Sequence, residues 1–135
     1  MADPDWDWSR VVVDHIRLNV SDYDASRRFY ATVLAPLDIP LLGEIEGRSA
    51  MLANLNVFRR DPVTRNVHLC FVARTREAVD RFHEAGVDAG YRSNGPPGYR
   101  EEYGGGYYAA FLLDPDGNNI EALHRIGEEL EGGHR

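Results

Sequence analysis

An internal repeat limits the possible folds of this chain more strongly than any other feature of its sequence. Offset by 53 positions, His15-Ile16-Arg17-Leu18 aligns with His68-Leu69-Cys70-Phe71, and a helical pattern of apolar residues follows each segment. The expected helices run from Ser21 to Leu34 and from about Thr75 to Ala85, where Gly86 ends the pattern. Because each unit continues with several short strands, the sequence predicts an α+β fold of two βαβββ modules.

The repeat also defines the domain organisation. The predicted segments are an N-terminal arm over 1–10, a single domain over 11–126 with modules at about 11–60 and about 65–126, and a flexible acidic tail over 127–135. The arm contains two tryptophans, Trp6 and Trp8. Either their indoles pack on the domain or on a partner subunit, or both residues belong to a frayed terminus.

Local patterns give the remaining elements. We expect a strand from Val11 to Val20, two or three short strands within 39–60, and a mobile loop rich in Gly, Pro and Tyr over 94–106. The clearest element is a β-hairpin from Tyr107 to Leu123, whose Asp-Pro-Asp-Gly-Asn turn fixes the register. Alternation along its second strand places Glu121 at mid-strand on a rigid element.

Composition and charge restrict the partners. The net charge of −7 and the pI near 5.1 argue against nucleic acid and anionic membranes, which leaves small molecules. All 15 basic residues are arginines, so lysine chemistry is excluded. A single cysteine, an acidic start and the lack of an apolar run of about 20 residues predict a cytoplasmic location.

Three side chains are candidate metal ligands. His15, His68 and Glu121 lie on three expected strands, on faces turned away from the helices, with 53 positions between successive members. Two imidazoles and one carboxylate that converge from one side form a facial triad, which leaves coordination positions open for water or substrate. The competing interpretation is that both histidines are ordinary structural residues of their strands.

These segments resemble the vicinal oxygen chelate superfamily, also described as the glyoxalase / bleomycin-resistance / extradiol-dioxygenase fold. The resemblance covers about residues 11–126 and is carried by Asp14 to Asp22, Ala25 to Tyr30, His68 to Ala73, Asn94 to Gly98, and Tyr107 to Ala122. It implies two modules whose sheets curl around a site with one divalent metal ion, iron, manganese, zinc or nickel, at His15, His68 and Glu121. It also implies a homodimer, in which both chains often contribute to each site.

The resemblance bears on the reaction as well. The glyoxalase I type has a fourth ligand, which acts as acid and base, on the last strand of the first module. Aligning Asn56-Val57-Phe58 with Asn119-Ile120-Glu121 puts Phe58 at that position, so glyoxalase I activity is not expected. Three ligands with open positions resemble instead the dioxygenases, thiol transferases and epimerases of the superfamily, in which the metal binds two neighbouring substrate oxygens.

We therefore predict a divalent-metal enzyme of dioxygenase, lyase or transferase type that chelates a small oxygen-rich substrate. Tyr103 is the candidate catalytic residue, Arg17, Arg100 and Tyr107 are candidate substrate contacts, and the 94–106 loop is the expected lid. The alternative is a metal-independent protein that binds a drug or metabolite, as bleomycin-resistance proteins do. A third interpretation is an accessory dimer that retains the triad as a relic.

Overall fold

The computed structural model describes residues 5–125, so the predicted tail at 127–135 lies outside the described residues. The helices are α1 (Tyr23–Leu34), η1 (Ala35–Leu37), α2 (Arg76–Asp88) and η2 (Glu101–Tyr103), where η marks a short 3-10 helix. The strands are β1 (Ile16–Val20), β2 (Leu41–Ile45), β3 (Ser49–Leu52), β4 (Leu55–Arg59), β5 (His68–Val72), β6 (Ser93–Tyr99), β7 (Tyr107–Leu113) and β8 (Asn119–Arg125).

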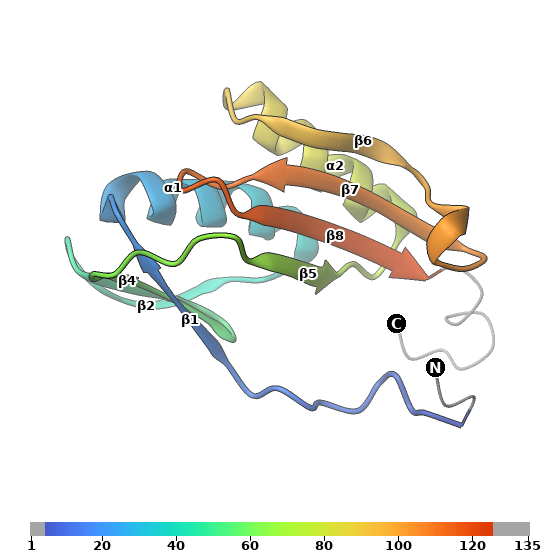
Figure 1. The fold of residues 1–135 in the computed structure, drawn as a ribbon, viewed down its shortest axis with the longest axis horizontal. Helices are drawn as coiled ribbons and strands as arrows, with labels where there is room; N and C mark the ends of the chain where they lie inside the picture. The colour runs from blue at the N-terminus through green and yellow to red at the C-terminus, as the bar shows by residue number, and fades with distance from the viewer. Residues whose placement is uncertain (1–4, 126–135) are drawn as a thin grey trace.

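The two halves of the chain repeat one topology. The strand order is β1-β4-β3-β2 in the first sheet and β5-β8-β7-β6 in the second. In each module the first and last strands pair in parallel, and the other pairs are antiparallel. The predicted fold of two βαβββ modules is confirmed, with one mixed sheet for each module (Figure 1).

Helices cover one face of each sheet and share one core. Helix α1 packs on β3 and β4, α2 packs on β6, β7 and β8, and the two helices contact each other. Phe29 of α1 and Phe82 of α2 are both fully buried in this core. On the opposite face of the second sheet, β5 presents the exposed residues His68, Cys70 and Val72. Among the described helices, none has the length and apolar character needed to cross a membrane.

The first strand is shorter than predicted. Strand β1 begins at Ile16, where pairing with Leu55 begins, and the valines before it have no such partner strand in that sheet. Val11, Val12 and Val13 are consequently 76%, 67% and 67% exposed. The chain before β1 is therefore an extended arm that runs beneath the second sheet toward the end of β8 (Figure 1).

The prediction of a mobile loop at 94–106 is wrong for its first half, because β6 (Ser93–Tyr99) pairs with β7. Glycines and prolines normally indicate a loop, but β6 is the edge strand of its sheet, where a proline costs no ladder hydrogen bond on the solvent side. Register shifts accompany Gly95 and Gly98. This segment is the edge strand of the second sheet, so a lid could involve only the residues after Tyr99.

The prediction that Gly86 ends the second helix is also wrong. Helix α2 continues to Asp88, and Gly86 is buried within it. A Cβ atom at this position would lie 2.5 Å from Leu112 Cδ1 and 3.3 Å from Val33 Cγ1. The glycine is therefore required by the close approach of α2 to β7 and α1, and not by a turn.

We expect Gly86→Ala to lower the free energy of unfolding by about 1 to 3 kcal/mol, because the added methyl group overpacks the contact with Leu112. Gly43→Ala is the matched control, since a Cβ at Gly43 has nothing within 4 Å. Urea denaturation of both variants measures the difference. Equal stabilities for the two variants would contradict this interpretation of Gly86.

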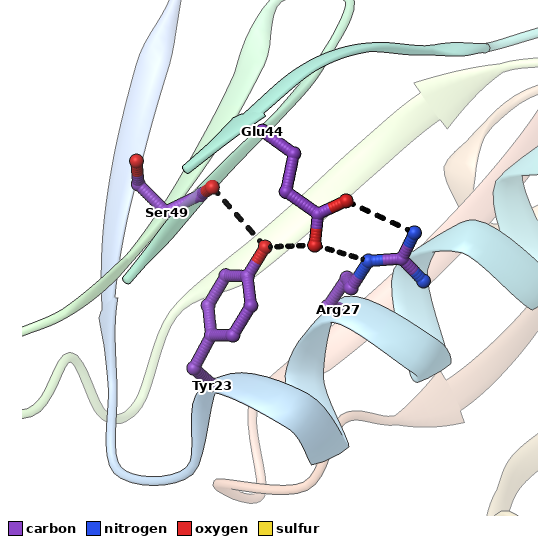
Figure 2. A network of polar contacts seen from close by, with 4 residues as sticks. All are labelled: Tyr23, Arg27, Glu44 and Ser49. Atoms are coloured by element: carbon purple, nitrogen blue, oxygen red, sulfur yellow. Dashed lines mark hydrogen bonds and ion pairs between the residues drawn. The ribbon is translucent and has the colours of Figure 1, made fainter. Parts of the chain in front are cut away.

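A polar network fastens the β2–β3 hairpin to α1 (Figure 2). Arg27 donates to both carboxylate oxygens of Glu44, at 2.6 and 3.1 Å, and the Tyr23 hydroxyl donates to Glu44 at 2.7 Å. The Tyr23 oxygen also lies 3.1 Å from the Ser49 carbonyl oxygen. Burial, followed by the bond to Glu44, raises the pKa of Tyr23 to about 12, so its hydroxyl remains a donor at neutral pH.

The hydrogen bonds from Arg27 and then Tyr23 lower the pKa of Glu44 below its ordinary value of 4.5. The ionised carboxylate therefore stabilises the folded state above that value, and the contribution is lost as the pH falls through the lowered pKa. We expect Glu44→Gln to be less stable than the wild type at pH 7, and the difference in stability to shrink as the pH falls below 4.5, with Glu46→Gln as control. Thermal unfolding of the wild type and both variants at a series of pH values tests this expectation. A difference in stability between Glu44→Gln and the wild type that does not change with pH would contradict it.

Candidate functional site

The centre of the candidate site is Glu121, in the middle of the second sheet. Strand β8 lies between β5 and β7, so Glu121 pairs with Cys70 on one side and with Phe111 on the other. Its side chain is only 1% exposed. A carboxylate removed from water is strongly destabilising unless hydrogen bonds satisfy its oxygens.

Each oxygen of Glu121 has a side-chain hydrogen-bond partner. His68 Nε2 lies 2.6 Å from Oε1, and the Tyr107 hydroxyl donates to Oε2 over 2.5 Å. His68 comes from β5 and is 53% exposed, whereas Tyr107 comes from the start of β7. Three strands thus bring an imidazole, a phenol and a buried carboxylate into one cluster on the open face of the second sheet.

Tyr107 acts in this cluster as a hydrogen-bond donor. Desolvation raises the pKa of Tyr107 above its ordinary value, and the hydrogen bond to Glu121 adds to the rise. The phenol therefore remains protonated at neutral pH and is available to hold Glu121 in place. The sequence prediction gave Tyr107 as a substrate contact, and its bond to Glu121 was missed because the two residues are not directly paired across the hairpin.

His15 occupies the corresponding place in the first module. It directly precedes β1, as its repeat counterpart His68 opens β5, and its side chain is 62% exposed. Its Nδ1 lies 2.7 Å from Asp14 Oδ1. It borders a cavity of about 390 Å³ whose lining also includes Met51 and Asn56.

The donor set suits a divalent cation only in part. An imidazole nitrogen and a carboxylate oxygen in contact, His68 Nε2 and Glu121 Oε1, are two donors of the kind that borderline divalent metals prefer. Within residues 5–125 of a single chain, however, no group of three or more His, Cys, Asp or Glu side chains is placed to hold a metal ion. The chain thus brings His68 and Glu121 together and does not bring His15 to them.

The position predicted for a fourth ligand needs correction. Glu121 pairs in parallel with Cys70, and Arg17, the repeat counterpart of Cys70, pairs with Asn56. The structural counterpart of Glu121 in the first module is therefore Asn56, and the alignment that chose Phe58 was wrong by two residues. The chemical consequence is unchanged, because an amide supplies no carboxylate for acid and base catalysis.

The remaining predicted site residues lie on both sheets. The exposed ring of Tyr103 packs edge-on against Tyr107, with ring centroids 5.3 Å apart. Arg100 donates to the Pro96 carbonyl at 2.6 Å and places its guanidinium 5.3 Å from the centre of the Phe111 ring. Tyr103 therefore contacts a member of the Glu121 cluster, and Arg100 contacts Phe111, the strand neighbour of Glu121. Arg17 belongs to the first sheet, where its guanidinium lies over the ring of Phe58.

Comparison with known proteins gives a family match and similar solved structures. Residues 12–122 match the Glyoxalase/Bleomycin resistance protein/Dioxygenase superfamily. A glyoxalase/bleomycin resistance protein from Albidiferax ferrireducens T118 is 32% identical with a TM-score of 0.68, over 83% of this chain and 98% of that one. A glyoxalase/dioxygenase from Nostoc punctiforme is 25% identical with a TM-score of 0.64, over 84% and 90% of the two chains.

A lactoylglutathione lyase from Agrobacterium tumefaciens, at 19% identity and a TM-score of 0.63 over 91% of this chain and 98% of that one, is similar in fold alone. No curated protein matches the sequence. The family match and the two-module topology together identify the class: the chain belongs to the Glyoxalase/Bleomycin resistance protein/Dioxygenase superfamily.

Cys70 offers a direct probe of the cluster, because it is exposed and is the only cysteine in the chain. Desolvation of the thiol, followed by the Glu121 carboxylate, raises the pKa of Cys70. Since the thiolate is the reactive form, Glu121→Gln should lower this pKa and speed alkylation at pH 8. The rate with iodoacetamide in the presence of chelator measures the effect, with Glu84→Gln on α2 as control; unchanged or slower alkylation in Glu121→Gln would contradict the contact.

Proposed function

We propose that this protein is a divalent-metal enzyme that chelates a small oxygen-rich substrate at His68 and Glu121, with His15 as third ligand. The observation that carries the proposal is the contact between His68 Nε2 and Glu121 Oε1, at 2.6 Å, around a carboxylate that is only 1% exposed. Burial of a carboxylate is costly without charged or hydrogen-bonded partners, and the accessible imidazole leaves this carboxylate open to a further partner from solvent. It is the arrangement that a cation would stabilise.

We further propose that His15 comes from a second copy of the chain. Each chain carries the two parts of the site on separate sheets, and within its described residues no third ligand stands beside His68 and Glu121. Two apolar side chains that line the same cavity as His15 are also exposed, Leu42 at 64% and Met51 at 45%. A second copy that covers this surface would bury them and bring its own His68 and Glu121 to the His15 of the first.

The residues around the cluster suit an oxygen-rich substrate. A bound divalent cation supplies Lewis acidity, which polarises two neighbouring substrate oxygens and stabilises negative charge that develops on them. Arg100 and Tyr103 border the cluster from one end of β6 and β7, where they would orient the substrate. Tyr103 remains the candidate proton carrier, since it is 59% exposed while the Tyr107 hydroxyl is already engaged by Glu121.

Mixing two defective variants tests the proposal. His15→Ala and His68→Ala should each fail to bind Co(II) as homodimers, because each lacks one ligand of every site. If each site joins two chains, a heterodimer of the two variants contains one intact site, with both substitutions confined to the other. Co-refolded mixtures should then bind Co(II) at one site per heterodimer, as measured by the visible spectrum of the bound metal.

The possible outcomes separate the alternatives. Without restored binding in the mixture, the site lies within one chain and the shared arrangement is wrong. Wild-type protein that binds no divalent metal, and retains small-molecule binding in the presence of chelator, would support the metal-independent binding protein instead. A His83→Ala substitution on α2 is the control, because the His83 ring bonds to Ser93, away from the cluster.

A cytoplasmic location belongs to the same proposal. Its support is the single cysteine of the chain, Cys70, which can form no internal disulfide, as is usual for proteins of a reducing compartment.

A further inference from the structure

The N-terminal arm reaches the candidate site through a series of side-chain contacts. The guanidinium of Arg125, the last residue of β8, lies 4.6 Å from the centre of the Trp8 ring and 5.4 Å from that of Tyr107. Both distances are within the range in which a cation is attracted to an aromatic face. In Figure 1 the arm leaves β1 and runs below the second sheet to the side on which β8 ends.

The position of Arg125 follows from the hairpin. Arg125 pairs directly with Tyr107 across β7 and β8, and it is on the same face of β8 as Glu121, four residues earlier. The contacts therefore run from the Trp8 indole to the Arg125 guanidinium, to the Tyr107 ring, and from the Tyr107 hydroxyl to Glu121 Oε2 at 2.5 Å.

We propose that Trp8 and Arg125 are positioning residues of the Glu121 cluster. The indole of Trp8 contacts Arg125, and Arg125 in turn holds the ring of Tyr107 in place. The Tyr107 hydroxyl then keeps its hydrogen bond to Oε2 of Glu121. Oε1, beside His68, is left as the oxygen available to a cation. The role in cation binding rests on the proposed function, whereas the placement of Tyr107 is a property of the protein without metal.

The physical reason is that a carboxylate has two equivalent oxygens and can rotate between binding modes. Hydrogen bonds from neighbouring groups orient metal ligands, and loss of such a partner typically weakens metal binding by about 10- to 100-fold. Tyr107 supplies that hydrogen bond, but it stands at the first position of β7, where a strand end is easily disturbed. The Arg125 guanidinium, which also contacts the Trp8 ring, restricts the motion of the Tyr107 ring.

The arm provides its own matched control. Trp6, two residues before Trp8, has its ring against Arg10 of the arm itself, at 5.3 Å. Trp8→Ala and Trp6→Ala therefore remove the same side chain from the same segment, and only the first removes the contact with Arg125. Trp8→Phe retains an aromatic face and should rescue the Trp8→Ala effect.

The first measurement uses metal-free protein with a ¹³C label at Cζ of tyrosine, in which Tyr107→Phe assigns the Tyr107 resonance. We expect Trp8→Ala and Arg125→Ala to shift this resonance and Trp6→Ala to leave it in place. An unshifted resonance in a folded Trp8→Ala variant, with wild-type melting temperature, would overturn the proposal whatever the protein does with metals.

The second measurement is Co(II) affinity. Trp8→Ala should weaken it about two- to fivefold, as expected for loss of one cation–π contact, and Tyr107→Phe about tenfold. The double variant should be no weaker than Tyr107→Phe alone, because Trp8 acts through Tyr107. Additive losses of Co(II) affinity in the double variant would show that Trp8 does not act through Tyr107, and would overturn the proposal. Should the wild type bind no Co(II) while the Tyr107 resonance still shifts in Trp8→Ala, the proposed metal function fails and the positioning of Tyr107 by the arm stands.

Discussion

The burial of one carboxylate is the constraint on which the rest of the site depends. Glu121 is almost fully removed from solvent, and an ionised group in that position requires a partner for each oxygen. His68 and Tyr107 supply these partners from two different strands. Their convergence requires both the parallel pairing of β5 with β8 and the antiparallel pairing of β7 with β8. The strand register that defines the second sheet therefore also brings the residues of the site together.

The duplicated architecture has diverged between its halves. His68 opens the first strand of its module and His15 directly precedes that of the other, but the position that holds Glu121 in the second module holds Asn56 in the first. A site that combines the two halves, as proposed, would therefore have two imidazoles and one carboxylate, with a neutral amide at the fourth position. That composition favours open coordination positions over a closed set of four strong ligands.

Much of the fold was predictable from periodicity, because the two modules share a spacing of 53 residues and the Asp-Pro-Asp-Gly-Asn turn sets the hairpin that contains Glu121. The predictions failed where tertiary contacts override local signals. Gly86 is a packing residue under Leu112, and the prolines of β6 are tolerated at a sheet edge. The choice of Phe58 over Asn56 failed because two similar Asn-x-x segments align locally, while the true register comes from strand pairing.

The pairing of His68 with Glu121 was predictable from the sequence, whereas the contacts that support it were not. Strand alternation placed His68 and Glu121 on one face, and their contact is present. No sequence signal joins Tyr107 to Glu121 or Trp8 to Arg125, because these contacts depend on the reach of long side chains and on the path of the arm.

The most direct test of the account is anomalous X-ray scattering from crystals of the protein purified without added metal. We expect one peak within bonding distance of His68 Nε2 and Glu121 Oε1, about 2.0 to 2.2 Å from each donor, with His15 of a second copy as the third ligand. Crystals in which His68 and Glu121 remain in direct contact, without a peak and with His15 of every copy remote from them, would contradict it.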